Sequence, residues 1–239
     1  TGVPEGIQFQ TKLQIALDQI RQAVESEVAR GVVLADAAYG MDGQFRAGLR
    51  ALQLEYAVGV QSSMSVWGPG EQALPAKPLE KKRGRPAKLL RRDEQHQPVS
   101  SKQLALALLE TAWKEISWRE GSKKLGSRFA TVRVRPAHRD YKQSEPNPEE
   151  WLLIEWPKGA DEPSKYWLSS LPAATERHDL VGIAKHRWIV ERDYEELKQE
   201  LGLGHFEGRG WRGFHHHATL CIAAYGFHIA ERSLFSPSV

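Results

Sequence analysis

The sequence predicts an α/β fold with a β-rich stretch inserted into it. Helical and short apolar strand patterns alternate over the first 61 residues, and helical patterns return from residue 173 onwards. Runs typical of strands lie between these two parts. With 239 residues, of which 41% are hydrophobic and 26% charged, the chain has the composition of a globular protein with a sizeable core. It has no apolar run long enough to cross a bilayer, so we expect no membrane partner.

Residues 1–61 are predicted to form a helix–strand–helix–strand unit. A short apolar strand at 32–34 leads to Asp36, a second helix follows around 45–52, and a second strand covers 55–61. The first helix covers 9–28, because one apolar stripe recurs there at steps of three or four residues: Phe9, Leu13, Leu17, Ile20, Val24 and Val28.

Residues 62–172 are the predicted β-rich insertion, and residues 173–239 are the predicted C-terminal helices. The insertion is expected to contain one helix and three strands. After it we expect one long helix and a last helix. The insertion helix is predicted at 105–117 and its strands at 129–135, 151–156 and 165–171; the C-terminal helices are predicted at about 179–201 and 213–234.

The segment KKRGRPAKLLRR, residues 81–92, has seven basic residues and no acid. It could insert Arg-Gly-Arg into a DNA minor groove, or it could be a flexible loop that contacts phosphates without sequence preference. The second interpretation is the simpler one, and both imply DNA as a partner. The candidate DNA-binding residues of this segment are Lys81, Lys82, Arg83, Arg85, Lys88, Arg91 and Arg92.

Two carboxylates are candidate ligands of a metal ion. Asp36 follows an apolar strand, and ligands of open α/β sheets bind at the carboxyl ends of strands. The alternative is that Asp36 only caps a helix or a turn. Glu191 shares one helix flank with Arg187, Tyr194 and Lys198, at steps of four, three and four. Such a flank can also be a solvated helix surface without a catalytic role. Together, two distant carboxylates fit the oxygen chemistry that Mg²⁺ prefers.

The chain resembles the DDE-type transposases of bacterial insertion sequences. The resemblance is to the subgroup with a β-strand insertion before the final glutamate. It rests on VVLADAAYG around Asp36, on KYWLSSLP at 165–172, and on Arg187, Glu191 and Lys198 with three and six residues between them. The tyrosine of that motif falls on Ala184, which is a departure. The resemblance covers essentially the whole chain and implies a ribonuclease-H-like catalytic core.

The resemblance also implies an activity. Asp36 and Glu191 would be catalytic residues and would bind two Mg²⁺ (or Mn²⁺) ions. Water would attack a phosphodiester at the end of the element, and the freed 3′-hydroxyl would attack a second strand. Arg187, Lys198 and Tyr194 would contact DNA. A tryptophan of the insertion would stack on a flipped base, with five candidates: Trp67, Trp113, Trp118, Trp151 and Trp167.

The first aspartate of the implied catalytic triad has no candidate. Asp18 is the only aspartate before Asp36, and it lies inside the first predicted helix. We therefore expect the C-terminal part of a transposase, with a core incomplete at its N-terminus and inactive alone. The alternative is a non-catalytic DNA-binding or inhibitory relic. Expected partners are DNA ends and target DNA, with possible association with itself or with a full-length transposase. The expected location is the bacterial cytoplasm, at the nucleoid, which the single cysteine, Cys221, also fits.

Overall fold

A computed structural model of the chain describes residues 2–77 and 87–235. It divides into two compact units, which are described separately. The larger unit is Thr11–His186. The smaller unit combines the described parts of Thr1–Gln10 and Arg187–Val239.

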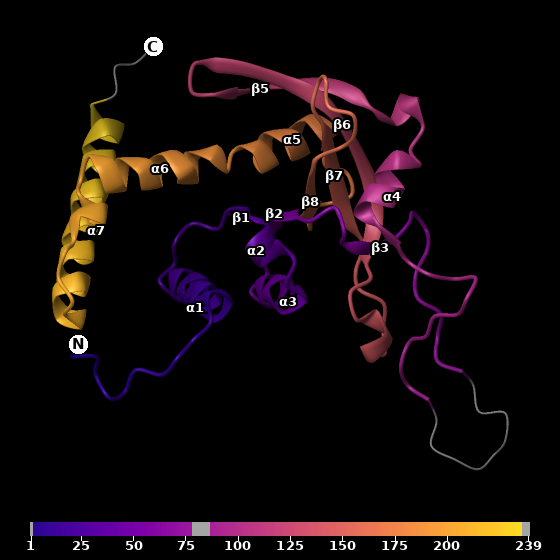
Figure 1. Cartoon of the computed structure of the whole chain (residues 1–239), viewed down its shortest axis with the longest axis horizontal. Coiled ribbons are helices and arrows are strands. Elements are labelled where there is room, and N and C mark those ends of the chain that lie inside the picture. The colour runs from indigo at the N-terminus through magenta and orange to yellow at the C-terminus, as the bar shows by residue number, and fades with distance from the viewer. Residues whose placement is uncertain (1, 78–86, 236–239) are drawn as a thin grey trace. The chain divides into compact units, whose positions relative to one another are not determined.

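The larger unit begins with the expected helix–strand–helix–strand order (Figure 1). Thr11 starts the first helix by a capping box, in which its hydroxyl accepts from the amide N–H of Gln14. The structure adds one short helix directly after the first strand. The elements are α1 (Lys12–Glu25), β1 (Val33–Ala35), α2 (Ala37–Gly40), α3 (Gly43–Ala51) and β2 (Tyr56–Val60).

The described residues of the larger unit form one mixed eight-stranded sheet. Its order is β1-β2-β8-β7-β6-β3-β4, with β5 paired to β6. The pair β1–β2 is parallel, and the other pairs are antiparallel. The remaining strands are β3 (Ser65–Trp67), β4 (Val99–Ser100), β5 (Lys114–Glu120), β6 (Lys123–Pro136), β7 (Glu150–Trp156) and β8 (Lys165–Ser169).

Helices cover both faces of this sheet. On one face, Leu152 and Ile154 of β7 belong to the largest buried cluster, and residues of α1 and α3 pack against or within it. On the other face, Phe129 and Leu153 pack with α5 (Arg177–Lys185). Neighbouring residues of a strand point to opposite faces, so each strand contributes side chains to the core on both faces of the sheet. The predicted strands at 129–135, 151–156 and 165–171 are confirmed.

The helix predicted at 105–117 is wrong. The structure has a short helix, α4 (Ser101–Leu106), then a 3₁₀ turn at Glu110–Ala112, and then strand β5. The apolar residues of this stretch fit a helical period, but those of β5 also alternate. Ile116 and Trp118 pack towards α5, while β5 pairs with β6 along its whole length. Pairing and packing across the sheet therefore outweigh the local helical pattern.

The single long helix predicted from about 179 to 201 is also wrong. It is divided into α5 and α6 (Trp188–Gln199). The last residue of α5, Lys185, is buried against the sheet, whereas α6 has no buried residue. The two helices belong to different units, which is why one apolar stripe does not run through both. The last helix is close to its predicted bounds, as α7 (Trp211–Leu234).

Lys185 is held in a buried aromatic cage. Its Nζ donates to Glu155 Oε2 at 2.6 Å and lies 4.2 Å from the ring centroid of Trp118 and 5.1 Å from that of Trp167. Burial lowers the pKa of the Lys185 ammonium, and the Glu155 carboxylate opposes this shift. This pair ties α5 to β7.

A close backbone contact holds α2 against β2. A Cβ atom on Gly40 would lie 1.9 Å from the carbonyl oxygen of Gly59, and one on Gly59 would lie 3.1 Å from the amide nitrogen of Ala37. Gly40 therefore needs glycine, and Gly59 leaves little room for a side chain. Arg46 of α3 adds a hydrogen bond to the Gly40 carbonyl. These contacts fix the turn that follows β1.

Removing the charge of Lys185 should destabilise the larger unit strongly. Lys185→Met is expected to lower the free energy of unfolding by about 3–5 kcal/mol, because Glu155 is left buried without a counter-charge. Urea unfolding followed by tryptophan fluorescence measures this loss. Lys124→Met, at an exposed lysine of β6, is the control and should change stability by at most about 0.5 kcal/mol. Equal losses in the two variants would contradict the role of the cage.

Adding one methyl group at Gly40 should separate α2 from β2. Gly40→Ala is expected to cost about 3 kcal/mol of stability, because the new Cβ overlaps backbone that cannot move aside. Gly182→Ala in α5 is the matched control, since nothing lies within 4 Å of its Cβ. That change should be neutral or stabilising. Thermal unfolding of both variants provides the measurement, and an unchanged melting temperature for Gly40→Ala would refute the contact.

Candidate metal and nucleic-acid site

Asp36 lies at the carboxyl end of β1 and caps α2. Its Oδ1 accepts a hydrogen bond from the amide N–H of Ala38 at 2.9 Å, and the residue is exposed. The capping role considered for this residue is therefore present. It does not conflict with metal binding, because a carboxylate oxygen can accept an N–H bond and still face solvent. The Gly40–Gly59 contact directly after it holds the backbone of this turn.

Glu191 lies in the first turn of α6, with its side chain 68% exposed. Its Oε1 accepts a hydrogen bond from Arg187 Nη1 at 2.6 Å. Lys198 lies farther along, with its Nζ 4.2 Å from the ring centroid of Tyr194. The expected helix flank therefore contains an ion pair between Arg187 and Glu191 and a cation–π contact between Lys198 and Tyr194. Its exposure also agrees with the interpretation as a solvated surface.

The two candidate carboxylates belong to different units of the chain. Asp36 is part of the larger unit and Glu191 of the smaller one. Over residues 2–77 and 87–235, no group of three or more His, Cys, Asp or Glu residues is arranged to hold a metal ion. Ala184, at the tyrosine position of the motif, is buried with Phe129 and Leu153. Metal binding by Asp36 and Glu191 remains a prediction.

The basic segment is only partly described. Lys81, Lys82, Arg83 and Arg85 lie outside the described residues. Lys88 is exposed, and Arg91 Nη1 lies 3.5 Å from Asp93 Oδ2. The remaining member, Arg92, forms an ion pair with Asp140. Contact of these residues with DNA also remains a prediction.

Arg92 is held by the buried Asp140. Its Nη2 lies 2.5 Å from Asp140 Oδ1 and also donates to the carbonyl of Ala137. The second carboxylate oxygen of Asp140 accepts from Trp67 Nε1 at 2.6 Å. This arrangement satisfies a buried carboxylate with two donors, so Arg92 stabilises the insertion whether or not it meets DNA.

The five candidate tryptophans have structural contacts. Trp67 and Trp113 are buried, and Trp118 and Trp167 flank Lys185. Trp151 donates to the Pro172 carbonyl at 3.0 Å. None of these contacts tests whether a tryptophan stacks on a flipped base, and that expectation remains a prediction.

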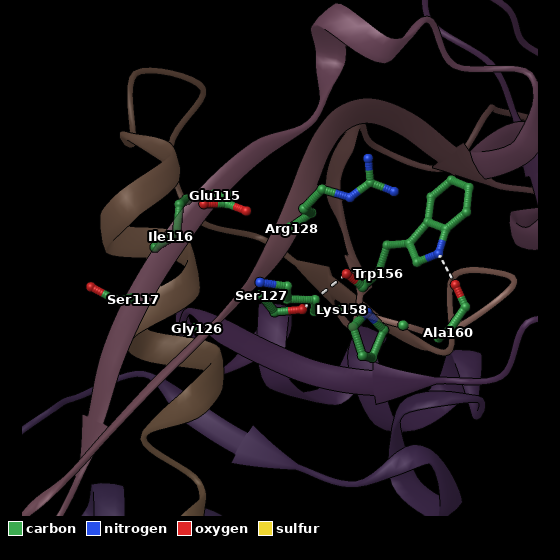
Figure 2. Close-up of a pocket in the computed structure, with 11 residues that line it drawn as sticks. Glu115, Ile116, Ser117, Gly126, Ser127, Arg128, Trp156, Lys158 and Ala160 are labelled. Atoms are coloured by element: carbon green, nitrogen blue, oxygen red, sulfur yellow. Dashed lines mark hydrogen bonds between the residues drawn. The ribbon is translucent and has the colours of Figure 1, made fainter.

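Sequence reasoning missed a cavity beside Trp156, of about 560 Å³ (Figure 2). The guanidinium carbon of Arg128 lies 4.7 Å from the Trp156 ring centroid, and Trp156 Nε1 donates to Ala160 O at 2.8 Å. Lys158 lines the same cavity. Arg128 and Trp156 are directly paired across β6 and β7, so strand register was the signal that could have joined them.

No helix of the described residues is both long and apolar enough to span a membrane. Among curated proteins, no match was found. The family model described as DDE superfamily endonuclease matches residues 1–125, which include Asp36 but not Glu191. Nucleases of this superfamily act on DNA and generally use divalent metals. The mixed sheet with helices agrees with the predicted α/β, ribonuclease-H-like class. The chain belongs to the DDE superfamily endonucleases.

Proposed function

We propose that this chain is part of a transposase that cleaves and joins DNA strands at insertion-sequence ends, with Asp36 and Glu191 as ligands of Mg²⁺ or Mn²⁺. The observation that carries the proposal is the position of Asp36. It is an exposed carboxylate at the carboxyl end of a parallel strand, within the region that matches the endonuclease family. The Arg187–Glu191 ion pair and the Lys198 position support it.

The donor chemistry of the two side chains fits a hard divalent cation. Both are carboxylates on exposed residues, and Mg²⁺ takes oxygen ligands from one or two protein carboxylates and from substrate phosphates. When bound, such ions would activate the attacking hydroxyl and stabilise the leaving oxygen. Asp36 and Glu191 both offer carboxylate oxygens, and neither offers a soft sulfur ligand. This donor set favours Mg²⁺ and Mn²⁺ over zinc.

The remaining residues would orient the carboxylates and the DNA. The Ala38 amide directs one oxygen of Asp36. Arg187 directs Glu191, and its planar guanidinium can also donate two parallel N–H bonds to a phosphate. Lys198, one turn beyond Tyr194, would neutralise a second phosphate. Each of these roles concerns binding and orientation.

A second candidate is a DNA-binding or inhibitory protein without catalysis. It is favoured by one observation, the lack of a three-residue metal-ligand group over residues 2–77 and 87–235. A binding protein needs the cations but not the two carboxylates. Metal binding therefore separates the two candidates.

Neutralising either carboxylate should weaken metal binding. Asp36→Asn and Glu191→Gln are each expected to lower Mn²⁺ affinity by about tenfold or more, because an amide oxygen is a weaker ligand than a carboxylate for a hard cation. Electron paramagnetic resonance of free Mn²⁺ measures this affinity directly, without requiring activity.

Glu195→Gln is the matched control for this experiment. Glu195 is an exposed carboxylate on the next turn of α6, and its Oε1 accepts a hydrogen bond from Gln199 Nε2 at 3.2 Å. Its change should leave the Mn²⁺ affinity within about twofold, because Glu195 is not a proposed ligand and its exposed charge is screened by solvent. Mn²⁺ binding that is equal in all three variants would favour the non-catalytic candidate.

A further inference from the structure

A second cavity, of about 390 Å³, lies in the larger unit between α3 and the residues that join β6 to β7. Asp36 does not line it, so it is separate from the candidate metal site. Four cationic side chains line it, with one histidine and two carboxylates. The cations are Arg46, Arg50, Arg139 and Lys142; the other ionisable residues are His138, Asp42 and Glu150.

Arg46 is the buried part of this cationic lining. Only 4% of the residue is exposed. One Nη1 bond to the Gly40 carbonyl is present, but its buried Nε has no hydrogen-bond acceptor among the described residues. A buried guanidinium N–H without a partner is costly. The Nε itself is not open to solvent, so Arg46 contributes positive charge to the lining rather than a direct Nε bond to an anion.

Both carboxylates of the lining already have partners. Asp42 Oδ1 accepts from the amide of Phe45 at 2.7 Å and so caps α3. Glu150 Oε1 accepts from Arg50 Nη1 at 2.9 Å, while its Oε2 is buried without a partner. Burial and the nearby Glu150 raise the pKa of the Tyr56 hydroxyl, which therefore stays neutral beside this pair. The Arg50–Glu150 end of the cavity is thus close to charge-balanced and disfavours an anion.

Arg139 and Lys142 provide the uncompensated charge. Both are exposed, and neither has an ion pair in the part of the chain that the structure describes. Asp140 lies between them in sequence and points inward to Trp67 and Arg92. Arg139 takes the left-handed conformation, with φ 57°, at the start of this turn. The buried Asp140 therefore fixes the backbone that presents the two cations.

We propose that this cavity binds a backbone phosphate of DNA through Arg139 and Lys142, with Arg46 adding a buried positive charge to the lining. Guanidinium groups bind phosphate oxygens through paired N–H bonds, and a lysine adds a point charge. The cations that line the cavity exceed the carboxylates by two. The identity of the ligand as DNA rests on the proposed function. Phosphate binding by itself does not.

The experiment compares two double variants of the full chain. Arg139→Gln with Lys142→Gln removes two charges at the cavity. Lys123→Gln with Lys124→Gln removes two exposed charges from the β5–β6 hairpin and is the matched control. Fluorescence anisotropy with a labelled duplex, in the presence of EDTA, measures DNA affinity over a series of salt concentrations.

The cavity variant should lose about tenfold in DNA affinity at low salt, the effect of one charge-assisted phosphate contact. Its slope of log affinity against log salt should fall by about one. The control should lose less than about twofold, as an exposed charge at a distance does. Arg46 stays unchanged in this comparison, because its hydrogen bond to the Gly40 carbonyl also holds the turn after β1.

Equal losses in the cavity variant and the control would overturn the cavity as a specific site. Millimolar inorganic phosphate provides a second arm. Suppose that phosphate raises the melting temperature of the unchanged chain but not that of the cavity variant, while the two bind DNA with equal affinity. The ligand is then a small phosphate, and DNA is excluded. Mn²⁺ affinity should be the same in the cavity variant as in the unchanged chain. Loss of Mn²⁺ binding at Asp36 or Glu191 thus remains a separate test of the proposed function.

Discussion

The antiparallel pairing of β2 with β8 is the interaction on which the larger unit depends. It joins residues more than 100 positions apart in sequence, from Ala57 with Ser169 to Val60 with Tyr166. Closing so long a loop costs entropy, which the burial of nearly all of β2 offsets. Because β2 also pairs with β1 and carries Gly59 against α2, the position of Asp36 depends on the same strand. The inserted strands therefore support the candidate site directly.

Buried ion pairs complete this frame. Glu155 holds Lys185 of α5, Asp140 holds Arg92, and Glu150 holds Arg50 of α3. Each pair joins elements that are distant in sequence. Losing one partner would leave a buried charge without a counter-charge, so these cations stabilise the fold. Counting basic residues in the sequence does not distinguish such structural cations from cations that bind DNA. Arg139 and Lys142 differ, because the structure leaves them at the mouth of a cavity.

Much of the fold could be predicted from local pattern. Apolar periodicity identified α1, β1, β2, β7 and β8. It failed where tertiary contacts decide, as in β5, whose pairing with β6 overrides a helical pattern, and at His186–Arg187, where the helix breaks between units. For the candidate site, the cap by Asp36 and the Arg187–Glu191 pair were predictable from spacing. The cavity beside α3 was not, because it brings together residues about 100 positions apart.

The proposal to test first is that Asp36 and Glu191 are each ligands of Mg²⁺ or Mn²⁺. Replacing Mg²⁺ by Fe²⁺ and adding ascorbate and peroxide generates hydroxyl radicals at the bound ion, which cut the backbone nearby. Mass spectrometry of the fragments then locates the ion. We predict cuts near Asp36 that are lost in Asp36→Asn, and cuts near Glu191 that are lost in Glu191→Gln. Cuts that persist in the variant lacking the nearby carboxylate, or no cuts near either residue, would contradict the proposal.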